Sequence, residues 1–254
     1  MSLLSTRQLS VSIGGRTLCE NLDLSITAGQ TWAVLGANGA GKTTLLHTLA
    51  GLHPAAAGEI NYLDRPLASW SARALACIRG ILLQDSQDAF PATVLETVLT
   101  GRHPYLRFWE FEGAADQALA ESLLQDVELQ AMAMRRTDTL SGGERRRLAI
   151  ATLLAQNPQI FLLDEPANHL DLRRQLVLLE LMQERCFAKQ GALLMSLHDI
   201  NMALRMCSHA LLLFENETLA GPVAEVLTLA NIEKLYGCRM KTINDNGTLF
   251  YWPV

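Results

Sequence analysis

The stretch Gly36-Ala37-Asn38-Gly39-Ala40-Gly41-Lys42-Thr43-Thr44 decides the fold of this 254-residue chain. It follows an apolar run, residues 31–35, and precedes a helix-like run, residues 45–50. Glycines here let consecutive backbone N–H groups turn inward around a polyphosphate, and the start of a helix adds the positive end of its dipole. The Lys42 ammonium suits the β- and γ-phosphates, and the Thr43 hydroxyl suits Mg²⁺. The order of strand, glycine-rich loop and helix predicts a nucleoside-triphosphate site, in preference to an ordinary turn.

The composition limits the class of protein. A chain of this length buries on the order of 70–75% of its unfolded surface, enough for one large domain or a domain with an insert. Its hydrophobic content of 49% and charged content of 19% are typical of a globular protein. The formal net charge of −5 argues against a protein that works mainly on nucleic-acid phosphates. Arginines cluster at residues 135–136, 145–147 and 173–174, which predicts either solvated helix faces or a local anionic partner.

The cysteines and the N-terminus favour an intracellular chain without a membrane span. The five cysteines are widely spaced, and no pair has metal-ligand or redox-motif spacing, so we expect reduced thiols in a cytosolic compartment. Residues 1–7 lack the apolar region and cleavage site of a signal peptide. No apolar run approaches the roughly 20 residues that span a bilayer, so work at a membrane would require another chain.

Hydrophobic periodicity divides the chain. Apolar residues alternate on both sides of Gly14-Gly15, which predicts an antiparallel sheet beside the nucleotide site. From Asp85 to Gln156 the spacing is helical, which predicts an all-helical insert over residues 85–156. Buried parallel strands are expected at three continuously apolar runs, residues 160–163, 192–197 and 210–214. We predict a single α/β domain over residues 1–254, with a mainly parallel core formed by 1–84 and 157–254, and a terminal hairpin over 240–254.

Polar residues with a role in chemistry follow the apolar runs, and they are Gly36, Gln84, Asp164, Glu165 and His198. The carboxyl ends of parallel strands meet at one edge of a sheet, where ligands bind. Successive strand residues point to opposite sides, so we expect Asp164 to hold Mg²⁺ and Glu165 to orient the attacking water. His198 taken alone is more typical of a packed histidine.

The segment Leu140-Ser141-Gly142-Gly143-Glu144 has the pattern of a capping box, in which Ser141 caps a helix and Glu144 returns the bond. Two glycines weaken a helix start unless something must approach the backbone. Bare amides, a hydroxyl and a helix N-terminus therefore predict a second anion site. Because one chain cannot easily fold both sites around the same phosphate, we expect a second copy to face the first.

In order along the chain, several motifs resemble those of the ATP-binding subunits of ABC transporters: residues 36–44, Gln84, 140–144, 160–165, His169-Leu170-Asp171 and His198. The resemblance covers nearly the whole chain. It implies a P-loop NTPase fold with an inserted helical subdomain that carries the 140–144 motif. It also implies ATP and Mg²⁺ as cofactors, and hydrolysis of ATP to ADP and phosphate.

The resemblance further implies a role for each motif. Gly36, Asn38, Gly39, Ala40, Gly41, Lys42, Thr43 and Thr44 would hold the phosphates, with Thr43, Gln84 and Asp164 at the metal. Two copies would sandwich two ATPs, with Ser141, Gly142 and Gly143 of one copy reaching the nucleotide of the other. Gln84 would also link the site to a permease. Asp171 would cross the dimer interface, and His198 would contact the γ-phosphate.

Within this family, residues 100–104, 140–148, 197–201 and 221–237 resemble the importers of cobalamin, ferric siderophores and haem. This implies a peripheral ATPase on the cytoplasmic face of the inner membrane, docked on integral permease subunits and served indirectly by a substrate-binding protein. A soluble ABC-type factor on ribosomes or DNA is the alternative, because ribosome-acting members share the 168–171 motif. Such members usually carry two domains and a charged linker, so we expect no nucleic-acid partner.

Two stretches depart from simple expectation. Family members usually stack an aromatic residue on adenine, and the matching position here is Ile13, so apolar contact would hold the base. Residues 102–111 concentrate aromatic side chains in a chain with 6% aromatic residues. They predict either core packing of the insert or an exposed patch that docks on the permease.

Overall fold

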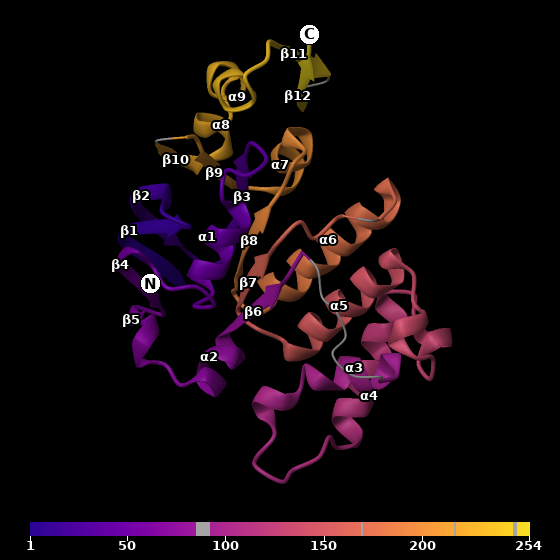
Figure 1. The fold of residues 1–254 in the computed structure, drawn as a ribbon. Coiled ribbons are helices and arrows are strands. Elements are labelled where there is room, and N and C mark those ends of the chain that lie inside the picture. The colour runs from indigo at the N-terminus through magenta and orange to yellow at the C-terminus, as the bar shows by residue number, and fades with distance from the viewer. Residues whose placement is uncertain (85–91, 169, 216, 246–247) are drawn as a thin grey trace.

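The computed structural model describes residues 1–84, 92–168, 170–215, 217–245 and 248–254. Its central sheet runs through the middle of the molecule (Figure 1), in the order β10 (Thr218–Pro222), β9 (His209–Leu213), β3 (Thr31–Gly36), β8 (Ala192–Ser196), β7 (Ile160–Leu163) and β6 (Arg79–Leu82). Neighbouring strands are parallel, except that the edge strand β10 is antiparallel to β9. The three continuously apolar runs therefore form buried parallel strands, as predicted.

The N-terminal residues form a second, antiparallel sheet. Its order is β2 (Arg16–Ile26), β1 (Leu4–Ile13), β4 (Ala57–Tyr62) and β5 (Arg65–Pro66). The turn between β1 and β2 is Gly14-Gly15, and both glycines have positive φ, of 57° and 80°. A side chain would be strained in that conformation, so this turn explains the glycine pair and confirms the predicted hairpin.

Alternating side chains of β3 enter two separate cores. Trp32 and Val34 pack with the N-terminal sheet and with α1 (Lys42–Leu49). Ala33 and Leu35 pack on the other face of the sheet, in the cluster that includes residues of α6 (Leu172–Phe187) and α7 (Ile200–Met206). A strand that is covered on both faces reads as a continuous apolar run because neither set of alternating positions meets water.

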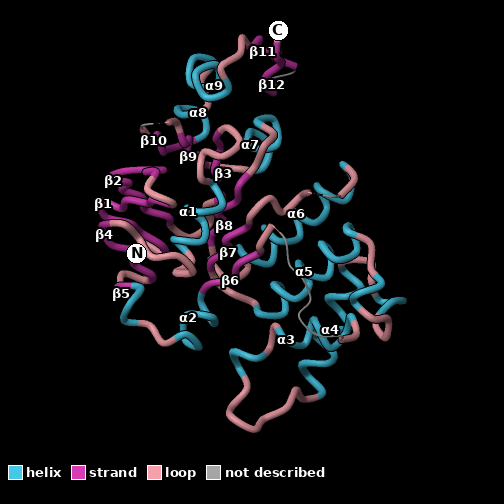
Figure 2. Tube along the Cα trace, viewed as in Figure 1, coloured by secondary structure: helices cyan, strands magenta, loops and turns pink. Residues whose placement is uncertain are grey.

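Between residues 92 and 156 the chain forms helices joined by loops, as Figure 2 shows, and residues 85–91 of the predicted insert lie outside the described residues. Its helices are α3 (Val94–Thr100), α4 (Ala114–Asp126) and α5 (Gly142–Gln156), with short 3₁₀ turns at His103–Tyr105, Gln130–Met132 and Thr137–Thr139. The only extended pairing among the described residues of this segment is a single bridge between Thr93 and Arg136. The chain enters the central sheet from α2 (Ala72–Ile78) into β6, leaves it after β6 for the helical segment, and returns to it at β7.

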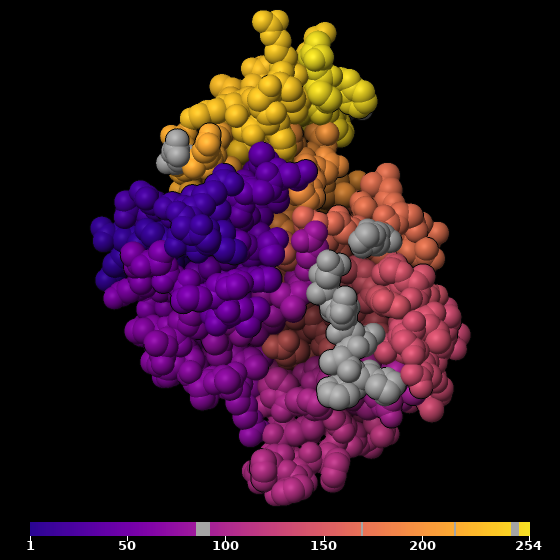
Figure 3. Space-filling model, in the orientation of Figure 1, coloured from indigo at the N-terminus to yellow at the C-terminus, as the bar shows by residue number. Residues whose placement is uncertain are grey.

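The C-terminal residues form the end of the molecule that lies farthest from the helical segment (Figures 1 and 3). They comprise α8 (Val223–Val226), α9 (Leu229–Tyr236) and the antiparallel strands β11 (Met240–Asp245) and β12 (Thr248–Pro253). The predicted hairpin is thus confirmed in its strands, while its turn at 246–247 lies outside the described residues. None of the helices in the described ranges is both long and apolar enough to cross a membrane.

Candidate functional site

The glycine-rich loop joins β3 to α1, and its backbone shape requires glycine at two places. Gly39 and Gly41 have φ values of 76° and 96°, in the left-handed region that strains other residues. A Cβ atom on Gly41 would also lie 2.7 Å from Cδ1 of Leu18 in β2. The N-terminal hairpin therefore packs directly against the loop and supports it.

Lys42 lies at the base of this loop and is 6% exposed. Its Nζ donates to the main-chain oxygen atoms of Gly36, at 2.9 Å, and Ala37, at 3.2 Å. Burial lowers the pKa of Lys42, and the Glu165 and Asp164 carboxylates oppose that shift. A confined ammonium at the base of a glycine-rich loop is the arrangement that a polyphosphate requires.

Asp164 follows β7 and is fully buried. Its Oδ1 accepts a hydrogen bond from Ser196 Oγ at 2.6 Å, whereas its buried Oδ2 has no hydrogen-bond partner among the described residues. An unpaired buried polar atom costs roughly 1–3 kcal/mol, and more when it is charged. The free carboxylate oxygen therefore fits a role as a ligand of Mg²⁺, which prefers such hard oxygens.

The Glu165 carboxylate contacts three other polar side chains at this edge of the sheet. Its Oε1 lies 2.6 Å from His198 Nε2, and its Oε2 accepts from Gln84 Nε2 at 3.1 Å and from Asn168 Nδ2. The two neighbouring acids do face different partners, as expected, but strand alternation is not the whole reason. Glu165 lies beyond the end of β7 with a φ of 47°, so a left-handed turn redirects its side chain.

A cleft of about 370 Å³ joins these parts. It is lined by Ile13, Arg16, Leu18, Asn38, Gly39, Gly41, Lys42, Thr43, Thr44, Gln84, Glu165 and His198. The structure thus brings P-loop residues together with three polar residues from the ends of separate strands. Asp164 does not line the cleft, but Ser196 Oγ connects its carboxylate to the main-chain N of Glu165. Ile13 is 51% exposed in this cleft, at the position where an aromatic residue is usual.

The residues of the second predicted anion site do not line this cleft. Ser141 is exposed and caps α5: its Oγ accepts from Glu144 N, and Glu144 Oε2 accepts from Ser141 N at 2.7 Å. The capping box is therefore confirmed, with Gly142 and Gly143 as the first residues of the helix. Asp171 is the exposed N-cap of α6, and its neighbour His169 lies outside the described residues.

The expectation of solvated arginine faces is wrong for two members of the triplet. Arg146 is 6% exposed and donates to the main-chain oxygens of Leu83, Asp164, Glu165 and Pro166. Arg147 is also buried and donates to two carbonyls at the end of α4. Both share buried helical stripes with Ile150 and Leu154, and that spacing was the signal in the sequence. Arg146 thus connects the ends of β6 and β7 at the site.

Two further residues were missed by sequence reasoning. Ser196 is buried at the end of β8, and its Oγ joins Asp164 to the main-chain N of Glu165. Asn168 donates to the Glu165 carboxylate. Small polar residues at strand ends are common, so only the fold distinguishes these from ordinary turn residues.

The aromatic stretch at residues 102–111 is exposed at its C-terminal end. Phe108, Trp109 and Phe111 are 86%, 84% and 83% exposed, so core packing of these side chains is ruled out. The rings of Phe108 and Trp109 meet edge to face, with centroids 5.0 Å apart. The stretch is anchored at Tyr105, whose hydroxyl donates to Gln156 O at 2.9 Å.

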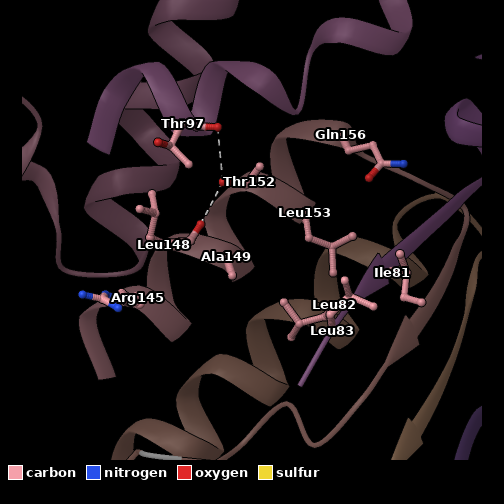
Figure 4. A pocket seen from close by; sticks show the side chains of 10 residues that line it. All are labelled: Ile81, Leu82, Leu83, Thr97, Arg145, Leu148, Ala149, Thr152, Leu153 and Gln156. Carbon is pink, nitrogen blue, oxygen red and sulfur yellow. Dashed lines mark hydrogen bonds between the residues drawn. The ribbon is translucent and has the colours of Figure 1, made fainter. Parts of the chain in front are cut away.

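An apolar groove of about 220 Å³ lies between β6 and the helices α3 and α5. Figure 4 shows side chains from the strand on one side and from the two helices on the other. Its lining is Ile81, Leu82, Leu83, Thr97, Arg145, Leu148, Ala149, Thr152, Leu153 and Gln156. The strand that lines it leads directly to Gln84, which lines the cleft beside the P-loop, so the groove and that cleft are adjacent along the chain.

Comparison with known proteins assigns the family. Residues 19–168 match the ABC transporter family. The chain is 36% identical over 247 residues to the hemin import ATP-binding protein HmuV of Thermobifida fusca (strain YX), covering 97% of this chain and 86% of that protein. It is 36% identical over 239 residues to the ferric enterobactin transport ATP-binding protein FepC of Escherichia coli (strain K12), covering 94% and 88%.

The structure agrees with this assignment. A chain of an ABC transporter solved in an inward-facing conformation superposes with a TM-score of 0.84 at 26% identity, covering 100% of this chain and 98% of that one. The resemblance inferred from the motifs is confirmed, and the chain belongs to the ABC transporter family.

Proposed function

We propose that this chain is the ATPase subunit that powers an importer of haem, ferric siderophore or cobalamin. Its relatives named above are subunits of hemin import and ferric enterobactin transport. The observation that carries the proposal is the convergence of Gln84 and His198 on the Glu165 carboxylate beside the P-loop. The relatives favour this membrane role over a soluble factor on ribosomes or DNA.

The site residues divide the work of hydrolysis. The loop amides and Lys42 bind the phosphates of ATP, and Glu165 orients the attacking water and accepts its proton. His198 holds the Glu165 carboxylate and meets the terminal phosphate. Thr43, Gln84 and Asp164 are the residues that would hold Mg²⁺, which supplies positive charge to the phosphates when it is bound.

Two copies complete the active unit. Ser141, Gly142 and Gly143 form an exposed helix start outside the cleft of their own chain. We assign them to the nucleotide that a second copy holds, because an exposed helix N-terminus with bare glycines accommodates an anion that approaches from outside. Asp171, which is also exposed, is assigned to the same interface.

Integral permease subunits are the second partner, and the chain docks on them at the cytoplasmic face of the inner membrane. A substrate-binding protein is a partner of the chain only indirectly, through the permease. The apolar groove beside Gln84 and the aromatic stretch are assigned to this contact, because both are apolar surfaces on the side of the helical segment. In this scheme residues 85–156 act as a subdomain that moves against the core of 1–84 and 157–254. This movement transmits the closure of the dimer to the permease.

The test of the chemistry is Glu165→Gln. We expect the turnover of ATP to fall at least about 100-fold, because the base is lost, while ATP binding is retained and dimers accumulate. Glu184→Gln, an exposed substitution on α6, is the matched control and keeps wild-type turnover. Wild-type hydrolysis by the Glu165→Gln protein would refute the assignment of Glu165 as the base.

The test of the partner uses Trp109→Glu in the presence of membranes that contain the permease. We expect the chain to be released from those membranes while its soluble ATPase activity changes less than about twofold, because Trp109 is 84% exposed and does not line the cleft. Co-sedimentation with membranes is compared with co-sedimentation with ribosomes. Unchanged membrane association of the variant would remove the aromatic stretch from the docking surface.

A further inference from the structure

One end of the nucleotide cleft has no role in the chemistry described above. The terminal phosphate must lie near Glu165, where water attacks, and the loop amides and Lys42 bind the phosphates that follow. The triphosphate therefore runs away from Glu165 along the loop. Apart from the P-loop residues and the group around Glu165, the residues that line the cleft are Ile13, Arg16 and Leu18 of the β1–β2 hairpin, and these are left to meet the nucleobase.

Arg16 is the charged side chain at this end. It is exposed, and it pairs with Ile13 across the β1–β2 hairpin, so the two side chains leave the same face of the sheet. Within the described part of the chain, its guanidinium forms no hydrogen bond, ion pair or ring contact. An arginine held beside a nucleotide cleft without a protein partner is available to a ligand.

The shape of the guanidinium decides what it can hold. It is a planar, weakly hydrated cation that stacks on aromatic ring faces, which an aliphatic side chain cannot do with the same electrostatic gain. Leu18 is buried and lies against Gly41, so it belongs to the floor of the cleft. Ile13 offers only apolar contact.

We infer that Arg16 holds the nucleobase of ATP by stacking its guanidinium on the ring, with Ile13 in apolar contact beside it. This inference rests on the proposed function of the cleft as an ATP site. The competing role for Arg16 is a simple ion pair with the phosphates. The two roles differ in whether the contribution of Arg16 to ligand affinity requires the nucleobase.

The experiment measures the affinity of the purified chain for MgATP and for inorganic tripolyphosphate by titration calorimetry. For Arg16→Ala we expect the affinity for MgATP to fall about tenfold and the affinity for tripolyphosphate to change less than about twofold. Adding Ile13→Tyr to Arg16→Ala restores most of the affinity for MgATP, because an aromatic ring then stacks on the base in place of the guanidinium. Arg7→Ala, an exposed arginine of β1, is the charge-matched control and changes neither affinity.

Two results would overturn the inference: equal losses for both ligands, which would assign Arg16 to the phosphates, or unchanged MgATP affinity. If Arg16→Ala does not fold, Arg16→Gln is measured in its place, with the thermal midpoint of unfolding as the check. Failure of the proposed function itself looks different, because the wild-type chain would then bind neither MgATP nor tripolyphosphate.

Discussion

Two glycine-rich helix starts of this molecule resemble each other in sequence and differ in their surroundings. The start of α1 is enclosed: Leu18 packs against Gly41, and Lys42 is almost fully buried. The start of α5 is exposed at Ser141 and Gly142, and its capping box pairs the amides of Ser141 and Glu144. Local sequence can therefore specify an anion site, whereas tertiary neighbours decide whether one chain completes it.

The largest expected effect compares Lys42→Ala with Ser141→Arg. Lys42→Ala should lower the affinity for ATP about 100-fold, because a confined positive charge is lost. Ser141→Arg should lower turnover by a similar factor and leave the ATP affinity of dilute monomer within about twofold, because its own cleft is intact. Binding by calorimetry and steady-state phosphate release measure the two effects.

Ser122→Arg, an exposed position on α4, is the control for steric bulk and keeps both properties. If Ser141→Arg weakens the affinity of the monomer as much as Lys42→Ala does, the two helix starts serve one nucleotide in one chain. The comparison between an enclosed and an open site would then fail.

A smaller effect is expected for Arg146, which connects α5 to the main chain that follows β6 and β7. Arg146→Met should lower the free energy of unfolding by roughly 2 kcal/mol, because two buried and two partly buried main-chain oxygens lose a donor. Arg145 is exposed and donates one hydrogen bond, to Asp138 O at 3.1 Å, so Arg145→Met should cost less than about 0.5 kcal/mol. Urea unfolding compares the two, and equal losses would mean that Arg146 does not support the strand ends.

The smallest effect concerns the cap of the open helix start. The hydrogen bond from the main chain of Ser141 holds the pKa of Glu144 below its ordinary value. A depressed carboxylate pKa stabilises the fold above the unfolded value of about 4.3, and that stability is lost as pH falls through the folded value. Wild type should therefore exceed Glu144→Gln by about 0.5 kcal/mol at pH 7 and lose this advantage below about pH 4. A difference that is constant with pH in thermal unfolding would exclude the ionised cap.

Much of the fold could be predicted because its signals are local. The glycine loop, the alternating hairpin and the apolar strands each depend on residues that are near one another in sequence, and the capping box is a four-residue pattern. The burial of Arg146 could not be predicted in the same way. Its partners lie 18 to 63 residues away, and its charge alone indicates a solvated position.

The same distinction applies to the site. The sequence by itself determined the P-loop, the pair of acids and the helix cap, because backbone conformation and residue chemistry act over a few residues. Only the tertiary structure decided that Glu165 turns toward His198 and Gln84, that Ser196 leaves one oxygen of Asp164 free, and that Ser141 does not line the cleft of its own chain. These outcomes depend on the packing of strands and helices that are distant in sequence, and no short pattern encodes that packing.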